Sequence, residues 1–458
     1  MRSGRTLKVG NGAGFWGDNL DAPYLLARDG RLDHLTLEYL AELTLSILAH
    51  LRSKDPNAGY VTDFLDLLKR LVPLLVDQPG LKVVTNAGGL NASGLARRCG
   101  AILADITSPI GVVTGDDVLG RLAEWTRAGV ALTHFETGEP IANVADRLVS
   151  ANAYLGARPI AEALKGGARV VLTGRVADAS LTLGPAAAAF DWGWDDWSKL
   201  AGASVAGHLI ECGAHATGGL WHRWDQVPDL ANVGYPIAEL HDDGSAVITK
   251  PEGTGGIVSV GNVTEQLLYE IDDPTCYRTP DIDVDMSMVD LKEVGPDRVL
   301  MTNARGRAPS DFLKVSAVYR DGWTASGMLA VVGRDAEAKA RAAGRIVLDR
   351  VRRAGFDLAD SLVECIGAGD IVPGVVRPES PPFEVVLRVT VRDPRREAVS
   401  RFCKELAPLV TAGPPGIAGY ASGRPEPRPA FGYFPTLVPK SLVEARVETR
   451  PARDWSIG

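Results

Sequence analysis

The sequence predicts an α/β fold in two parts: an N-terminal open, mostly parallel sheet with flanking helices over residues 1–280, and a smaller α+β domain over residues 281–458. Two observations predict the first part. Short apolar runs alternate with stretches of helical apolar spacing, and these runs end in loops rich in glycine, amide or charged side chains. In the second part, strand and helix patterns follow a strong hairpin signal. With 458 residues, the chain is also too long for one ordinary hydrophobic core.

Strands and helices alternate along the first part. Leucine-rich stripes at helical spacing predict one helix over residues 34–51 and another after Tyr60. Asp116 is expected to cap a helix over residues 118–128. The strands are expected at the apolar runs 7–9, 82–85, 110–114 and 169–173. Because parallel strands need a long crossover connection between them, this alternation favours a parallel sheet.

The last part begins with the hairpin signal. Residues 314–319 and 323–332 have strand character and flank the dipeptide Asp321-Gly322, which is typical of two-residue β-turns. The segment 413–429 is dense in proline and glycine, which indicates a rigid loop that serves as a fixed lid or a subunit contact. The other helices and strands of this part are expected at 336–354, 361–366, 383–391 and 394–409.

Composition excludes several classes of protein. The net charge is −8 and no stripe of lysine and arginine interleaved with aromatics occurs, so nucleic acid is not an expected partner. No apolar run approaches the roughly 20 residues that cross a bilayer, and the N-terminus lacks the apolar core of a signal peptide. The five cysteines are scattered and form no CxxC pair, which favours a reducing cytoplasm over a disulfide framework or a structural zinc site.

Chemically able side chains are densest at residues 207–219. If this stretch is helical, His208, Glu211, Cys212 and His215 share one face. A histidine that titrates near neutral pH suits a general acid or base, and Glu211 would orient it. The alternative is a buried helix of small residues whose histidines are only hydrogen-bonded to neighbours. The two histidines would lie about 10 Å apart along the helix axis, too far to bind one ion, so no metal is expected.

A glycine-rich loop at residues 10–19 follows the first expected strand, and a loop rich in glycine and asparagine at residues 86–91 follows another. Backbone N–H groups in the first loop could approach a phosphate or a carboxylate. Its glycines, however, lack the register of the dinucleotide-binding fingerprint, and no Gly-Lys-Ser/Thr sequence ends it. Neither a nicotinamide cofactor nor ATP is therefore expected.

The strand expected at 169–173 is followed by Arg175, Asp178 and Ser180. Arg175 suits a carboxylate or phosphate on a substrate, whereas an internal Arg175–Asp178 pair would only shape the turn. Lys250 precedes another glycine loop, where an ammonium group and backbone N–H groups could meet an anion. Because the carboxyl ends of parallel strands share one edge of a sheet, the side chains at strand ends are expected to converge. The candidate substrate-binding residues are Asn11, Asn19, Asn86, Asn91, Arg175, Ser180, Thr217, Lys250 and Thr254.

Four segments in order, 174–181, 207–219, 250–256 and 265–274, resemble the acyclic terpene utilisation (AtuA-like) family, once known only as a domain of unknown function. The loops at residues 10–19 and 86–91 fit the same family. The resemblance implies catabolism of branched terpenoid acids through CoA thioesters. Some relatives look longer, with a small ferredoxin-like domain after the matching part, which implies a separate small partner subunit for this chain.

Two classes of function follow. In the first, the chain is a cytoplasmic enzyme that hydrates, dehydrates or cleaves a small branched acid or its CoA thioester, with no cofactor apart from CoA as part of the substrate. The catalytic candidates are then His208, Glu211, His215 and Asp178. In the second, the chain is a non-catalytic ligand-binding or scaffold subunit of a catabolic complex. The aromatic and acidic segment 192–197 is expected to be a surface lid or a contact within a homo-oligomer.

Overall fold

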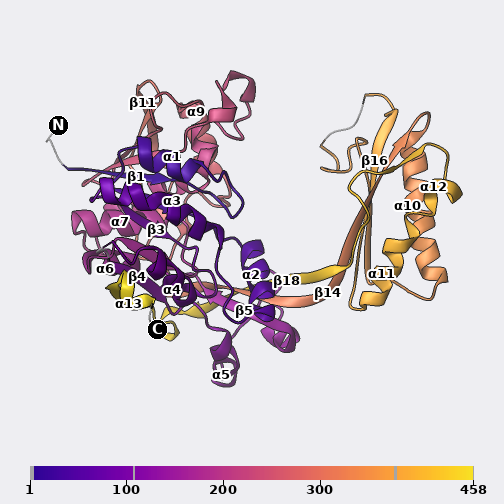
Figure 1. Cartoon of the computed structure of the whole chain (residues 1–458), viewed down its shortest axis with the longest axis horizontal. Helices are drawn as coiled ribbons and strands as arrows, with labels where there is room; N and C mark the ends of the chain where they lie inside the picture. The colour runs from indigo at the N-terminus through magenta and orange to yellow at the C-terminus, as the bar shows by residue number, and fades with distance from the viewer. Residues whose placement is uncertain (1–4, 107–108, 376–378, 457–458) are drawn as a thin grey trace. The chain divides into compact units, whose positions relative to one another are not determined.

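The computed structural model describes residues 5–106, 109–375 and 379–456, which form two compact units. Unit 1 comprises residues 1–318 and 433–458, and unit 2 comprises residues 319–432. The chain thus leaves unit 1 to form unit 2 and then returns to complete unit 1 (Figure 1). This division differs from the one expected at residue 280, because residues 290–302 supply strands to the sheet of unit 1.

The sheet of unit 1 is mixed, and its middle is parallel. Its strand order is β11-β12-β8-β7-β1-β2-β3-β6-β4-β19. The parallel strands are β1 (Thr6–Asn11), β2 (His34–Leu37), β3 (Lys82–Thr85), β6 (Val170–Thr173) and β4 (Pro109–Thr114). The antiparallel strands at the two sides are β7 (Ile237–His241), β8 (Ala246–Thr249), β12 (Arg298–Thr302), β11 (Asp290–Gly295) and β19 (Arg446–Pro451). The expectation of a mostly parallel sheet therefore holds only for the middle, because β7–β8 and β11–β12 are antiparallel hairpins and β19 returns antiparallel beside β4.

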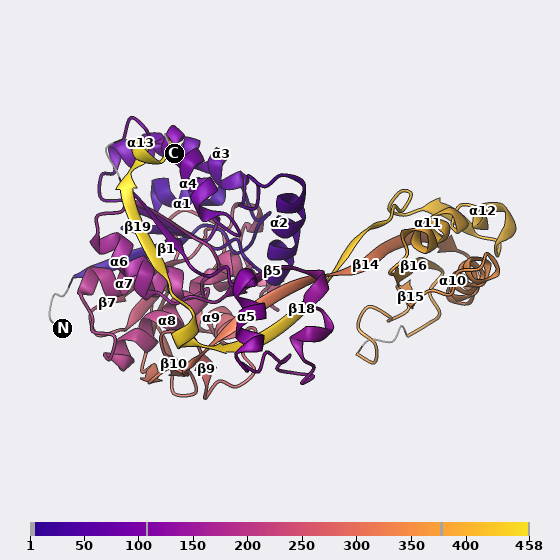
Figure 2. The same ribbon diagram turned by 90° about the horizontal axis from the view of Figure 1, so that it is seen from below.

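Helices cover both faces of this sheet (Figure 2). One face carries α1 (Ala22–Asp29), α3 (Asp63–Asp77), α4 (Ala92–Ile102) and α13 (Ala452–Trp455), and the other carries α6 (Arg158–Lys165), α7 (Ser180–Phe190) and α8 (Trp197–Glu211). Helix α8 is buried from Leu200 to Ile210. Its small residues permit this burial, because a Cβ at Gly207 would lie 2.8 Å from the carbonyl oxygen of Ala179.

The helix expected over residues 34–51 is partly wrong. Residues 34–37 form β2, and the helix that follows is α2 (Glu42–Lys54). All four residues of β2 are buried because the strand lies between β1 and β3 and pairs with both, so tertiary pairing overrides the helical spacing. The helix expected over 118–128 is a 3-10 turn, η1 (Leu119–Arg121), followed by the short α5 (Leu122–Arg127).

Unit 2 has the strand order β15-β16-β14-β17, and its pairings are antiparallel. Along the chain, its elements are β14 (Phe312–Val332), α10 (Ala336–Arg353), β15 (Asp360–Ile366), β16 (Glu384–Asp393), α11 (Arg396–Glu405), α12 (Leu409–Ala412) and β17 (Ile417–Tyr420). The helices cover one face of this sheet (Figure 1). The β-α-β-β-α-β order is that of a ferredoxin-like unit, so the chain carries such a unit of its own.

The expected hairpin at Asp321-Gly322 is wrong, because the dipeptide lies inside the continuous strand β14. Residues 323–332 pair with β16 instead of folding back onto residues 314–319. Gly322 has φ +79°, and a Cβ there would lie 2.6 Å from the carbonyl oxygen of Asp393. The glycine therefore permits a close approach between strands rather than a turn.

Strand β14 is long because it pairs with several partners. Besides β16 and β17, it pairs with β5 (Leu148–Ala153) and β18 (Arg428–Pro439). The proline- and glycine-rich segment 413–429 supplies β17 and the start of β18, so part of it is regular strand. Within the described residues, every helix is too short or too polar to cross a lipid bilayer.

Candidate functional site

Unit 1 contains a cavity of about 730 Å³ at the carboxyl ends of the parallel strands. The last turn of α8 contributes His208 and Glu211 to its wall, and the loop after β6 contributes Arg175 and Asp178. Two groups of residues that the sequence places far apart therefore line one cavity. Its volume lies in the range of roughly 300–1,000 Å³ that is usual for small-molecule sites.

His208 and Glu211 form a buried pair three residues apart on α8, with Nδ1 of His208 3.0 Å from Oε1 of Glu211. The other ring nitrogen, Nε2, lies 3.2 Å from the carbonyl oxygen of Leu267. Because a carbonyl only accepts, Nε2 carries a proton, and the Nδ1–Glu211 contact holds one further proton that either partner can carry. The ring of Tyr277 packs against His208 at a centroid distance of 5.6 Å.

Burial and pairing shift the pKa values of both partners. Burial raises the pKa of Glu211 to about 7, although the hydrogen bond to His208 opposes the shift. Burial would lower the pKa of His208, but the hydrogen bond and the charge of Glu211 outweigh it, so that pKa is raised. The pair therefore holds its shared proton more tightly than an isolated glutamate or histidine in water does, which suits a general acid.

The end of α8 is held in place by Asn11 at the end of β1. Its Nδ2 donates to the carbonyl oxygens of Ile210 at 2.9 Å and Glu211 at 2.8 Å, and its Oδ1 accepts from the hydroxyl of Thr36. Gln266 adds a hydrogen bond to the carbonyl oxygen of His208 at 2.8 Å. Asn11 is fully engaged and buried, so it positions α8 and does not face the cavity as a ligand contact.

Arg175 forms an ion pair with Asp178, which is one of the two arrangements that the sequence allows. Its guanidinium donates to Asp178 at 2.8 Å and to the carbonyl oxygen of Leu40 at 2.7 Å, and lies 4.1 Å from the centre of the Tyr154 ring. The Arg175 side chain is only 3% exposed, whereas that of Asp178 is 34% exposed. Asp178 is therefore the member of the pair that a ligand reaches most readily.

Two further carboxyl groups, those of Glu38 and Asp116, contact Arg175. Glu38 is 3.6 Å from its guanidinium and accepts a 2.5 Å hydrogen bond from Asn86. Burial, together with the charge of Asp178, raises the pKa of Glu38 well above its usual range. Asp116 accepts from the backbone N–H of Arg175 at 2.8 Å, and burial raises its pKa to about 6. The expected role of Asp116 as a helix cap is wrong, because its carboxylate holds the strand end after β6.

Another wall of the cavity contains a cluster that sequence reasoning missed. Lys314 at the start of β14 lies 3.2 Å from Glu42 and 4.8 Å from the centre of the Tyr154 ring. The hydroxyls of Tyr154 and Tyr433 donate to the same Glu42 oxygen at 2.8 and 3.3 Å. Burial would raise the pKa of Glu42, but the charge of Lys314 and the bond from Tyr154 lower it to about 2. No local motif marks this cluster, because its members come from four distant segments.

His215 does not share a face with His208. Helix α8 ends at Glu211, and Gly213 at φ +59° redirects the chain into a 3-10 turn, η4 (Gly213–Thr217). The His215 ring instead packs edge-on against Tyr269 at 5.0 Å. The expectation of one continuous helical face is therefore wrong beyond Glu211. In the part of the chain that the structure describes, no three His, Cys, Asp or Glu side chains are arranged to hold a metal ion.

The candidates in the glycine loop after β8 make local contacts away from the cavity. Lys250 donates to the carbonyl oxygen of Thr254 at 2.9 Å and pairs with Asp297 at 3.2 Å. The hydroxyl of Thr254 donates to the carbonyl oxygen of Pro251 at 2.6 Å. Thr217 is likewise bonded within its own turn, to the carbonyl oxygen of Ala214 at 3.0 Å. These residues shape their loops and do not line the cavity.

The remaining candidates stabilise helix ends. The side chain of Asn19 accepts from the backbone N–H of Asp21 at the start of α1, and that of Asn91 caps α4. Ser180, at the start of α7, donates to Asp281 at 3.2 Å. Gly14 of the first glycine-rich loop packs on the backbone of Cys212, where a Cβ would lie 2.8 Å away. The glycine there permits a close approach to the end of α8.

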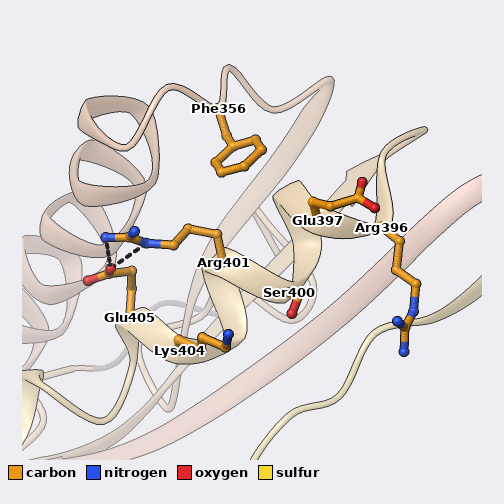
Figure 3. Close-up of a pocket in the computed structure, with 7 residues that line it drawn as sticks. All are labelled: Phe356, Arg396, Glu397, Ser400, Arg401, Lys404 and Glu405. Carbon is orange, nitrogen blue, oxygen red and sulfur yellow. Dashed lines mark hydrogen bonds and ion pairs between the residues drawn. The ribbon is translucent and has the colours of Figure 1, made fainter.

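Unit 2 has a cavity of about 400 Å³ on the exposed side of α11 (Figure 3). Arg401 and Glu405 point toward each other there and form an ion pair one helical turn apart at 2.6 Å. No histidine or cysteine of the described residues lines it. The lining residues are Phe356, Arg396, Glu397, Ser400, Arg401, Lys404 and Glu405. The cavity of unit 2 has no buried acid–base pair among these residues. The cavity of unit 1 is therefore the candidate site.

Comparisons with known proteins agree with the resemblance of the motifs. The family model described as "Acyclic terpene utilisation family protein AtuA" matches residues 7–449, nearly the whole chain. Comparisons with curated proteins and with solved structures found no match. The match covers both units and every segment of the candidate site. The chain therefore belongs to the acyclic terpene utilisation family AtuA.

Proposed function

We propose that the chain is an enzyme of acyclic terpenoid catabolism that moves protons on a small branched acid or its CoA thioester. Hydration or dehydration is the reaction that the site supports best, and carbon–carbon lyase chemistry would use the same groups. One observation carries the proposal: the His208–Glu211 pair and the Asp178 carboxylate line the same cavity. A proton donor and a proton acceptor on one cavity are the equipment of acid–base catalysis.

The roles divide by environment. The His208–Glu211 pair holds a proton that is shared at 3.0 Å, and the pKa of Glu211 is raised to about 7 by burial. This pair acts as the acid. Glu211 Oε2 is buried and has no hydrogen-bond partner among the described residues, and a substrate hydroxyl would supply the missing partner. Asp178, which Arg175 holds at 2.8 Å, acts as the base.

In the dehydrating direction, Asp178 accepts the proton from the carbon next to the carbonyl group. The carbon–oxygen bond of a neighbouring hydroxyl breaks as the His208–Glu211 pair donates its proton to the leaving oxygen. A carbon–carbon double bond forms and water leaves. Hydration reverses each step, and the pair and Asp178 exchange roles as base and acid.

The rim of the cavity supports a branched hydrocarbon substrate. Three large apolar side chains that line the cavity are strongly exposed: Phe135 at 49%, Phe312 at 49% and Leu437 at 44%. They come from three distant segments, and large exposed apolar side chains gathered at one site are typical of binding surfaces. The polar side chains of the cavity would bind the acid group of such a substrate, and the apolar side chains at the rim would contact its alkyl chain.

The proposal is tested by NMR in D₂O with branched acids and their CoA thioesters, recording exchange of the proton next to the carbonyl and loss of the hydroxyl. We expect Asp178→Asn to lose the exchange, and Glu211→Gln to lose net turnover, by about 100-fold or more. Glu265→Gln is the matched control, because Glu265 pairs with His222 away from the cavity. A wild-type protein inactive on all these compounds, or equal losses in the control, would favour the scaffold function instead.

A further inference from the structure

The charges of the cavity limit which substrate it accepts. Its lining holds three permanent cations and four carboxyl groups, so it carries no excess of positive charge. These residues are Arg175, Arg278 and Lys314, and Glu42, Asp178, Glu211 and Glu270. A CoA thioester carries its phosphate charges at the far end of the pantetheine arm and presents an uncharged carbonyl group to the cavity, whereas a free acid presents one negative charge. A ligand with a single negative charge fits this lining better.

Among the cations, Lys314 and the exposed Arg278 are available to a ligand, and Lys314 is the one that lies next to the Arg175–Asp178 pair. Arg175 is 3% exposed and already bonds Asp178 and a carbonyl oxygen. The Lys314 side chain is 37% exposed and lines the cavity, and its ammonium gives one hydrogen bond to Glu42 at 3.2 Å. An ammonium group has three N–H donors, so donors remain for an anionic group of a ligand.

The surroundings of Lys314 hold its ammonium in place. It lies 4.8 Å from the centre of the Tyr154 ring and 5.8 Å from that of Tyr433. The backbone N–H of Tyr154 donates to the carbonyl oxygen of Lys314 at 2.9 Å. Arg175 contacts the same Tyr154 ring at 4.1 Å, so Lys314 lies next to the Arg175–Asp178 pair. An anion bound by Lys314 is thereby placed beside the proposed base.

We propose that Lys314 binds the carboxylate of the substrate, and that the ligand of this cavity is the free branched acid rather than its CoA thioester. This inference rests on the proposed function and names its substrate class. A carboxylate supplies the one charge that Lys314 matches, whereas the thioester has none at that position. The apolar rim at Phe135, Phe312 and Leu437 then receives the branched chain.

The experiment is calorimetric titration of the full-length protein with 3,7-dimethyloctanoic acid, its primary amide and its CoA thioester. We expect the acid to bind about tenfold or more tightly than the uncharged amide, and more tightly than the thioester. Lys314→Met should remove the difference between acid and amide, and Lys314→Arg should keep it. Lys69→Met is the control, because Lys69 forms a comparable ion pair with Asp66 on α3, outside the cavity.

Tighter binding of the thioester, or a preference for the acid that persists in Lys314→Met, would overturn the inference. Circular dichroism of each variant separates a binding defect from unfolding, and Lys314→Arg decides if Lys314→Met fails to fold. Thioester binding with proton exchange would leave the proposed function standing without this inference. Lys314-dependent binding of the acid without proton exchange would support the role of Lys314 and overturn the proposed acid–base function. An absence of binding by all three compounds would overturn both proposals.

Discussion

The amide nitrogen of Asn11 donates to the carbonyl oxygen of Glu211 at 2.8 Å, across 200 residues of sequence. Asn11 ends the first strand of the sheet, and Glu211 ends the helix that carries the acid–base pair. The last carbonyl groups of a helix have no partner within it, and burial makes an unpaired carbonyl costly. This one side chain therefore ties the candidate site to the middle of the sheet.

Asn11→Ala should destabilise the protein by about 2–3 kcal/mol, because it removes the buried amide that donates to the carbonyl oxygens of Ala13, Ile210 and Glu211. Urea unfolding measures the change in the free energy of unfolding. Asn19→Ala serves as the control, since its exposed side chain only caps α1 and should lose about 1 kcal/mol. Equal losses in the two variants would contradict the role given to Asn11.

The pH dependence of stability should differ between the wild-type protein and Glu211→Gln. Burial raises the pKa of Glu211 from 4.5 to about 7, so the folded state binds the proton more tightly than the unfolded state. The stabilisation is fully present below pH 4.5 and is lost as the pH rises through about 7. Glu211→Gln lacks this titration. The wild type should therefore lose stability relative to the variant as the pH rises from 4.5 through about 7, as urea unfolding at each pH measures. A constant difference would contradict the shift.

Gly207→Ala should destabilise the protein by about 2 kcal/mol or more, although alanine favours an isolated helix. A Cβ at this position would lie 2.8 Å from the carbonyl oxygen of Ala179 and 2.9 Å from its Cα, so α8 would have to move. Gly120→Ala is the matched control, because a Cβ there meets nothing within 4 Å. Chemical denaturation of both variants makes the comparison, and a stabilised Gly207→Ala would contradict this packing.

Arg175→Met should lose about 3–5 kcal/mol of stability, because it removes the partner of Asp178 and a buried donor to Leu40. Lys314→Met should lose about 1 kcal/mol or less, since both members of the Lys314–Glu42 pair are 37% exposed and solvent screens them. Thermal and urea unfolding distinguish the two. The opposite order would contradict the structural role given to Arg175.

Several parts of the site could be predicted from local sequence. The runs 82–85 and 169–173 have the composition of buried strands, and their ends lie at one edge of the sheet as parallel pairing requires. The spacing of His208 and Glu211 is enough to place them on one helical turn. Lys314 and Glu42 are different, because 272 residues separate them and neither lies in a local motif. Only the pairing of β5 with β14 brings Tyr154 beside Lys314.

By itself, the sequence determined the α/β class, the strand ends that meet at one edge, the His208–Glu211 pair and membership of the family, because each depends on short-range periodicity or on motifs within a few residues. Tertiary structure decided the rest. Gly213, at φ +59°, ends the helical path after α8, so that His215 and His208 do not share a helical face. The sequence alone does not predict this turn, because glycine also occurs within helices. Asp321-Gly322 lies inside strand β14, which pairs with β16 from Trp323 onward, although the dipeptide alone favours a turn. Where the local preference of a segment conflicts with its tertiary contacts, the tertiary contacts determine the conformation, since burial and strand pairing contribute more free energy than the preference of one dipeptide.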